Sequence, residues 1–347
     1  MAAYDSILNV DEWISDHYFT TDETKGESFT KRVKNRTKEW SELEEETGTL
    51  SPVKRFQQCR GDLQKAFATN ADADATDSLI HTAFGFGAPE SETYTRAGEE
   101  LSYDGWHGNA GTLIVVSAAA AIDSDGGDDD GANDDVTVDN LVTLPVAGGV
   151  TPAGKEPQPT TVSKLIGDLF LSQDPPEFIV VIAGTWVLLA ERESWPLGRY
   201  LAINLQLAVE RNDTKKAGEL ERIAVILARE NLERAADGTT WWVQTREESQ
   251  QHSVKVSKDL RDAVRESIQI IGNDVLNRRR EQNLLIDDLD GNELARQSLR
   301  YLYRILFLLF AEASPELAIL PTGAPEYVDG LRPGSPSRPD PGTAGDG

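Results

Sequence analysis

The chain has 347 residues, with 59 Asp and Glu against 34 Lys and Arg, and its formal net charge is −25 at pH 7. This length suits two domains or one large domain with appendages. Acidic residues occur in almost every segment, so the charge favours adaptation to high salt and gives no signal for or against nucleic acid. The single cysteine, Cys59, excludes a disulfide framework. The N-terminus has neither the basic start nor the apolar run of a signal peptide, so we expect a cytoplasmic protein.

Residues 1–88 are predicted to form an N-terminal helical region. Apolar spacing favours helices over 6–19, 28–46, 51–67 and 77–84. A basic cluster lies within the second of these helices and comprises Lys31, Arg32, Lys34, Arg36 and Lys38. These side chains either pair with the acidic residues that follow at helical spacing or contact phosphates.

Residues 89–212 are predicted to form a small mixed-sheet domain, which makes the fold class α+β. The apolar residues 112–119 predict a buried strand, and 178–190 predict a hairpin with its turn at Gly184-Thr185. A third strand, at 199–205, leads into a helix that ends near residue 212. Between the first strand and the hairpin, residues from about 122 to 161 are predicted to form a disordered acidic insert, because Asp, Gly, Pro and Thr dominate there.

Residues 213–325 are predicted to form a helical connector, followed by a disordered tail at 326–347. Its helices are expected at 217–232, from Ser257 to about Arg280, and at 292–313, with Asn292 as the N-cap of the last. Of the adjacent Trp241 and Trp242, one is expected in the core and one at an edge.

The segment 292–313 has the densest apolar content in the chain. Its uninterrupted apolar run, 305–311, is too short to cross a bilayer, so we expect no membrane partner. We therefore expect a core helix whose apolar sides exceed what the rest of the chain can cover. Alone, such a helix must leave apolar surface exposed or find a partner.

Six arginines are candidates for DNA contact. Arg296, Arg300 and Arg304 are four residues apart and form a stripe along one edge of the last helix. Arg278, Arg279 and Arg280 lie in the last turn of the preceding helix, where cations also suit the helix dipole. Ion pairing with acidic neighbours is the alternative for the stripe.

The sequence contains one weak catalytic pattern. Restriction nucleases often place an acidic residue before one strand of a hairpin and Glu-x-Lys at the end of the next, where the carboxylates hold Mg²⁺. Glu177 precedes the predicted hairpin, and Glu191 and Glu193 end it. Because Glu193 occupies the Lys position, the pattern is degenerate, and both an active nuclease site and ordinary carboxylates at a strand end stay open. There is no zinc-ligand spacing, phosphate-binding loop or dinucleotide fingerprint.

Several blocks of sequence carry a family resemblance. The most specific is 297–313, QSLRYLYRILFLLFAEA, and weaker blocks lie at 17–19, 38–40, 60–63, 178–191, 198–201, 247–252, 256–260 and 320–327. In their order, and over most of residues 11–327, they resemble the N-terminal region of large adenine-specific DNA methyltransferases. These are the type IIG restriction-modification and phage-defence enzymes, including the DISARM and BREX methylases.

The resemblance implies a nuclease-like or scaffold domain and a helical connector that contribute DNA contact or domain assembly. In that family a methyltransferase domain follows, which binds S-adenosylmethionine at a Gly-rich loop and has an Asn-Pro-Pro-aromatic motif. This sequence has neither motif, so we expect no cofactor site, a truncated family member, and a methyltransferase domain or subunit that packs on 292–313. The alternatives are a Mg²⁺-dependent DNA endonuclease and a non-enzymatic scaffold that binds a separate methylase subunit.

Overall fold

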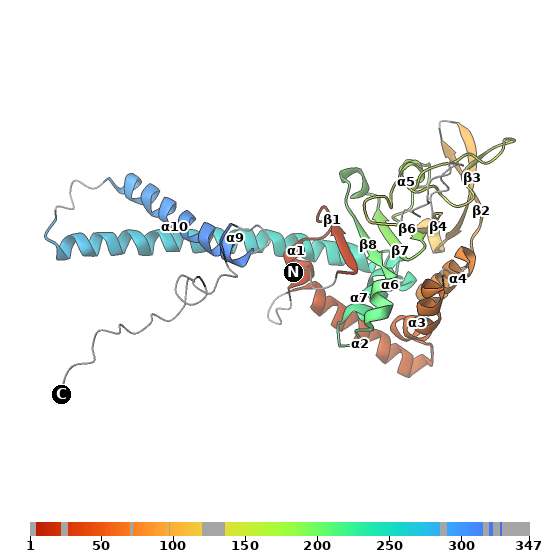
Figure 1. Cartoon of the computed structure of the whole chain (residues 1–347), viewed down its shortest axis with the longest axis horizontal. Coiled ribbons are helices and arrows are strands. Elements are labelled where there is room, and N and C mark those ends of the chain that lie inside the picture. Colours follow the sequence, from red (N-terminus) through yellow and green to blue (C-terminus); the bar gives the residue numbers. More distant parts are fainter. Residues whose placement is uncertain are drawn as a thin grey trace. The chain divides into compact units, whose positions relative to one another are not determined.

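The computed structural model describes residues 5–21, 27–69, 72–96, 98–119, 136–284, 290–314, 319–321 and 327. Its contacts divide the chain into a larger unit, residues 1–254, and a smaller unit, residues 255–347. The larger unit combines helices with a single mixed sheet, and the smaller one is helical (Figure 1). The predicted α+β class, with N-terminal helices and a C-terminal helical part, is confirmed.

Among the described residues the sheet has eight strands in the order β1-β8-β7-β6-β4-β3-β2, with β5 paired to β3. Only β4 and β6 run parallel, and the other described strand pairs are antiparallel. The strands are β1 (Ile7–Val10), β2 (Glu90–Arg96), β3 (Glu99–His107), β4 (Leu113–Ser117), β5 (Thr151–Pro152), β6 (Phe178–Ala183), β7 (Trp186–Glu191) and β8 (Tyr200–Asn204).

The predicted hairpin is confirmed as β6 and β7. Gly184 in its turn has a φ of 60°, a left-handed conformation that glycine adopts without a steric penalty. The register pairs Ala183 with Trp186 next to the turn and Phe178 with Glu191 at the far end. The strand predicted at 199–205 is also confirmed as β8, and it leads directly into α6 (Leu205–Arg211), which ends at Asn212 in the left-handed region.

Both faces of the sheet are covered, which explains why β6 is buried along its whole length. One apolar core joins one face of the strands to helices α1 (Asp16–Thr20), α2 (Phe29–Thr47), α3 (Pro52–Ala68), α4 (Ala73–Phe84), α6, α7 (Glu219–Leu227) and α8 (Arg229–Leu232). A second core joins the other face to α5 (Val162–Phe170) and to the chain between residues 136 and 150.

The long helix α9 (Trp241–Glu281) is anchored in the larger unit by its first turn. Trp242 is completely buried, and its ring lies 4.8 Å from that of Trp13 and 5.9 Å from that of Phe29, centroid to centroid. Trp241 is only partly buried, which confirms that one tryptophan lies in the core and the other at its edge. Such aromatic contacts contribute about 0.5–1.5 kcal/mol each beyond area burial.

The structure corrects several sequence-based predictions. The first segment forms strand β1 before helix α1, where a single helix over 6–19 was expected. Ser257 does not cap a helix, because α9 begins at Trp241 and passes through it. The division between units falls after Val254 and not near residue 212, since α7, α8 and the start of α9 pack into the larger core.

The prediction of disorder over 122–161 is wrong for residues 136–161. Four apolar side chains of this stretch are buried against the sheet: Leu141, Leu144, Val146 and Val150. Backbone hydrogen bonds also tie it to neighbouring segments, for example from the amide of Ala147 to the carbonyl of Ser117. Residues 120–135, which include the whole acidic run at 123–135, lie outside the described residues, as do residues 326 and 328–347 of the predicted tail.

The described helices of the smaller unit are residues 255–281 of α9 and α10 (Gly291–Ala313). The N-cap of α10 is Asp290, whose side chain accepts from the amide of Asn292, so Asn292 is not the cap. Leu294 of α10 lies against Gly272 of α9. No described helix is both long and apolar enough to cross a membrane.

Candidate functional site

Glu191, the central residue of the nuclease-like pattern, is buried among protein partners. Its carboxylate accepts from Trp13 Nε1 at 3.0 Å and from Ser194 Oγ at 2.6 Å, and it forms an ion pair with Arg246 of α9. Burial lowers the pKa of Arg246. Three donors therefore hold the two oxygens of Glu191 in place, so this carboxylate has a structural role in the conformation observed.

The other two carboxylates of the pattern point to different partners. Glu177 pairs with Arg234 at 3.3 Å, and Glu193, which is exposed, approaches Arg246 at 3.5 Å. The register places Phe178, not Glu177, opposite Glu191. Neighbouring residues of a strand point to opposite faces, so this register does not direct the two carboxylates toward a shared point. Within the described ranges, no group of three or more His, Cys, Asp or Glu side chains is arranged to hold a metal ion.

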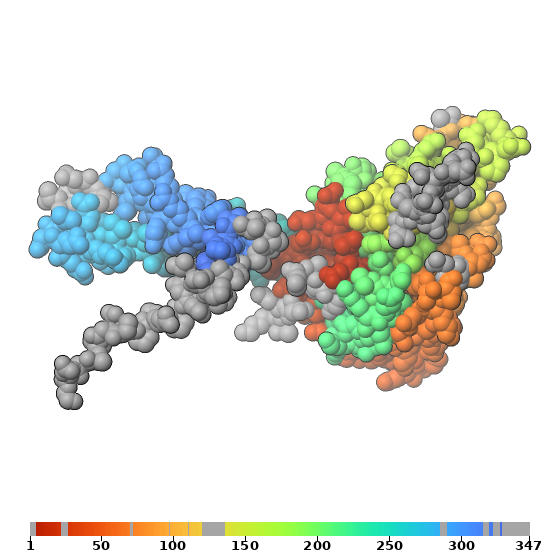
Figure 2. Space-filling view, in the orientation of Figure 1, coloured from red at the N-terminus to blue at the C-terminus, as the bar shows by residue number. Residues whose placement is uncertain are grey.

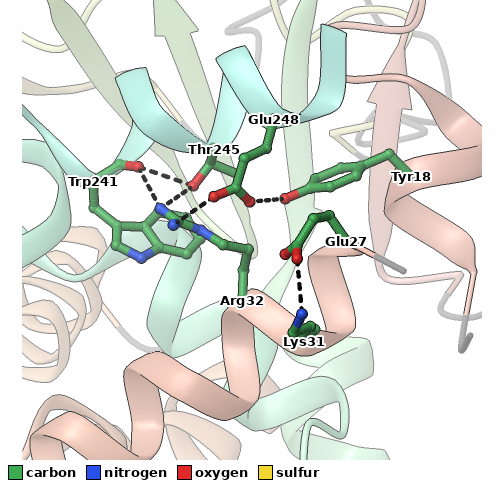
Figure 3. A network of polar contacts seen from close by, with 7 residues as sticks. All are labelled: Tyr18, Glu27, Lys31, Arg32, Trp241, Thr245 and Glu248. Carbon is green, nitrogen blue, oxygen red and sulfur yellow. Dashed lines mark hydrogen bonds and ion pairs between the residues drawn. The ribbon is translucent and has the colours of Figure 1, made fainter. Parts of the chain in front are cut away.

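A polar network beside this site ties α9 to the N-terminal helices (Figure 3). Arg32 of α2 donates to the carboxylate of Glu248 at 3.1 Å, to Thr245 Oγ1 at 3.1 Å and to the carbonyl of Trp241 at 3.3 Å. Tyr18 donates to the other oxygen of Glu248 at 3.1 Å, and burial raises the pKa of this phenol. The network fixes the first two turns of α9 against α1 and α2.

The basic cluster of α2 serves the same packing. Besides Arg32, Arg36 donates to Asn231 at 2.7 Å and pairs with Glu39 at 2.9 Å, while Lys31 pairs with Glu27 and Lys38 with Glu42. These contacts favour the structural interpretation of the cluster over a phosphate-binding arm, because its guanidinium groups are already occupied.

Helix α10, which is blue in Figure 2, presents a different kind of surface, because its apolar side chains are largely exposed. Tyr303, Phe307 and Phe310 are 60%, 56% and 55% exposed. Residues 305–310 are all exposed and apolar, and six consecutive residues make more than one full helical turn. Apolar side chains therefore face outward on every side of this part of α10. The expectation of a core helix is not met within the described chain, whereas the expectation of uncovered apolar surface is confirmed.

A shallow apolar hollow of about 400 Å³ lies on this surface and is lined by Tyr303, Arg304, Phe307 and Leu308. Large exposed apolar patches on proteins usually mark interaction sites. The hollow places an arginine of the predicted stripe next to the aromatic residues.

The arginine candidates for DNA contact differ in their surroundings. Arg296 pairs with Glu293 at 3.1 Å, Arg278 pairs with Asp274 at 2.8 Å, and Arg280 donates to Asn277. Arg279 also has an interaction partner. Arg300 and Arg304 are exposed, and within the described chain neither has a salt bridge.

Two helical segments of the smaller unit are slightly basic, although the unit as a whole, residues 255–347, has 12 Lys or Arg against 15 Asp or Glu. Residues 255–281 contain seven Lys or Arg and five Asp or Glu, and Gly291–Ala313 contains three and two, so these two helical segments together carry +3 against −25 for the whole chain. The exposed arginines of α10 lie among its exposed apolar side chains, so this helix suits a partner with apolar surface and some acidic groups.

Sequence reasoning found Glu191 and the arginines but missed Arg246, Glu248 and Arg32 as partners. Their contacts join residues more than 50 positions apart, and no local spacing signals such pairs. Comparison of the chain with protein-family models, with curated proteins and with solved structures finds no match.

Proposed function

We propose that this chain is the non-catalytic N-terminal portion of an adenine-specific DNA methyltransferase of a restriction-modification or phage-defence system. In this proposal the larger unit is a scaffold, and the smaller unit carries the contacts to a methyltransferase domain or subunit and to DNA. The sequence resemblance over residues 11–327 supplies the family, and the exposed surface of α10 is the observation that carries the assignment.

The apolar surface supports a protein partner. Tyr303, Phe307 and Phe310 are all more than half exposed on one helix, and a cluster of exposed aromatic side chains is typical of an interaction site, whereas isolated exposed apolar residues are common. Burial of apolar area contributes about 25 cal/mol per Å², and aromatic residues dominate the energetics of interfaces. A methyltransferase domain that covers these residues would bury them.

Two exposed arginines support DNA contact by the same unit. Arg300 and Arg304 have exposed guanidinium groups, and phosphate contact is the usual use of arginines at a DNA surface. The nuclease alternative receives less support, because Glu191 is engaged by Trp13, Ser194 and Arg246.

The proposal is tested by co-expression of the chain with the methyltransferase candidate encoded beside its gene, at high salt. We expect co-purification and adenine methylation of DNA. The double variant Phe307→Glu/Phe310→Glu should lose co-purification, because it places two charges in the apolar contact. The matched control, Leu260→Glu/Ile270→Glu, changes two side chains of α9 that are 61% and 62% exposed, and it should retain the complex.

Equal loss of the complex in both double variants would contradict a specific role for α10. Adjacent reading frames that encode neither a Gly-rich cofactor loop nor an Asn-Pro-Pro-aromatic motif would contradict the family assignment itself.

A further inference from the structure

A pocket of about 410 Å³ lies in the larger unit, and Glu191 is not among the residues that line it. One wall is a stripe of α4 at helical spacing: Asp74, Asp77, Ser78, His81 and Thr82. The opposite wall is the chain from Phe86 to Pro89, and Ser117 at the end of β4 completes the lining. This volume lies within the range of sites that bind small molecules.

His81 supplies a hydrogen-bond acceptor to this pocket. The residue is only 6% exposed, and its Nδ1 lies 2.5 Å from the carbonyl oxygen of Gly87. A carbonyl can only accept, so Nδ1 carries the proton. Burial lowers the pKa of His81, which keeps the ring neutral near pH 7. Nε2 is then an acceptor, and among the described residues it has no hydrogen-bond partner.

Asp77 supplies a second acceptor one helical turn away. Its hydrogen bond comes from the Ser117 side chain, and burial together with the charge of Asp74 raises its pKa to about 6. The described chain gives Asp77 no ion pair, and no Lys or Arg lines the pocket. A carboxylate that is mostly buried is normally paired with a cation. Here the protein itself supplies none.

The apolar part of the lining comes from Phe86, Ala88 and Pro89. Gly87 holds this segment close to the sheet, since a Cβ there would collide with the ring of Trp106. The pocket therefore combines two acceptors and a negative charge on one wall with carbon surface on the other.

We propose that this pocket binds a small organic cation with N–H donors and a short apolar chain, of the alkylammonium or alkylguanidinium class. The cationic group donates to the carboxylate of Asp77 and to Nε2 of His81, and the alkyl chain lies against Phe86 and Pro89. Such charge-assisted hydrogen bonds are about twice as strong as neutral ones.

The test uses the full-length protein at pH 7.5 and constant ionic strength. Butylammonium and butylguanidinium are titrated by calorimetry, and His81 is followed by NMR with ¹³C-labelled histidine. Butanol and butyrate serve as neutral and anionic controls of the same chain length. We expect the cations to bind and to shift the His81 resonance, and each control to bind at least 10-fold more weakly.

Asp77→Asn should weaken cation binding at least 10-fold, whereas the matched charge removal Asp104→Asn, at an exposed position outside the pocket, should change it less than 2-fold. Binding of butanol as tight as that of butylammonium would overturn the proposal. Absence of any His81 shift at saturating cation would overturn it as well, and this second readout needs no variant to fold.

Discussion

Arg246 of α9 donates through Nη1 to Oε1 of Glu191 at the end of β7. The two side chains are 19% and 7% exposed, so the ion pair is largely shielded from water. Trp13 and Ser194 occupy the other oxygen of the carboxylate. One carboxylate thus connects the sheet, the N-terminal segment and the long helix.

Glu191→Ala should destabilise the larger unit by about 3 kcal/mol, because it leaves the largely buried Arg246 guanidinium with only its longer contact to the exposed Glu193. Removal of the exposed neighbour in Glu193→Ala should cost less than about 0.5 kcal/mol. Denaturant unfolding monitored by tryptophan fluorescence at high salt measures both. Mg²⁺-dependent DNA cleavage that Glu191→Ala abolishes without a change in stability would contradict the structural role.

Arg222 is a second buried cation, 1% exposed, and we expect it to be more sensitive than any surface arginine. It donates to the carbonyl of Ala217 at 3.0 Å, to the carbonyl of Phe19 at 3.2 Å and to the hydroxyl of Thr30. Arg222→Ala removes these donors and opens a cavity, so a loss of about 3–5 kcal/mol is expected. The control Arg265→Ala, at an exposed site of α9, should leave the unfolding midpoint unchanged within error.

Asp77 should make stability depend on pH between about 4 and 7. Its folded pKa, about 6, lies above the ordinary value of 3.8, so the folded state binds this proton more tightly. The stabilisation is fully present below pH 4 and is lost as pH rises through 6. The variant Asp77→Asn cannot ionise at this position. Its free energy of unfolding should therefore exceed that of the wild type by about 1–2 kcal/mol at pH 7.5 and equal it near pH 4.

This comparison uses the difference between two proteins, because other groups at the pocket titrate too. Asp74 is retained in both, and His81, whose pKa burial lowers, destabilises both when it is protonated at low pH. A stability difference that is constant from pH 4 to 7.5 would show that Asp77 is not the source.

The salt dependence of DNA binding should distinguish the arginines of the smaller unit. Arg300→Gln/Arg304→Gln is expected to reduce the slope of log K against log salt by about 1.8, at ~0.9 per phosphate contact. Arg278→Gln/Arg296→Gln removes the same charge from residues that already pair with Asp274 and Glu293. This control should change the slope by less than half as much.

If both double variants have the same salt slope as the unmodified chain, phosphate contact by this stripe is wrong. Fluorescence anisotropy with a labelled duplex, over a series of salt concentrations, provides the measurement.

The sequence was most informative where structure is local. The hairpin of β6 and β7 follows from two apolar runs around Gly184, and the end of α6 follows from Asn212. Strand β1 was missed because it is four residues long and depends on pairing with β8, far along the chain. The burial of Leu141 and Leu144 is not predicted, because the composition around them is that of a loop. Their packing against one face of the sheet is visible only in the folded chain.

The candidate sites show the same limit. Charge and spacing identified Glu191 and the arginine stripe, but the partners that decide their roles come from distant segments. Asp77 and His81 are four residues apart on α4, a spacing that is visible in the sequence. Their significance depends on Ser117 and Gly87, which fold onto them from other elements.

The covering of the sheet on both faces has a consequence for how β6 and β7 find their alignment. In a hairpin with one solvent-exposed face, a slip of the register by one residue turns the apolar side chains toward water and is therefore unfavourable. In β6 and β7 both faces are buried, so a register shifted by one residue would still bury apolar side chains, and hydrophobic burial alone does not select the observed register. Features at the two ends of the hairpin favour the observed register: the turn at Gly184, and Glu191, whose carboxylate meets Trp13 and Ser194 in this alignment.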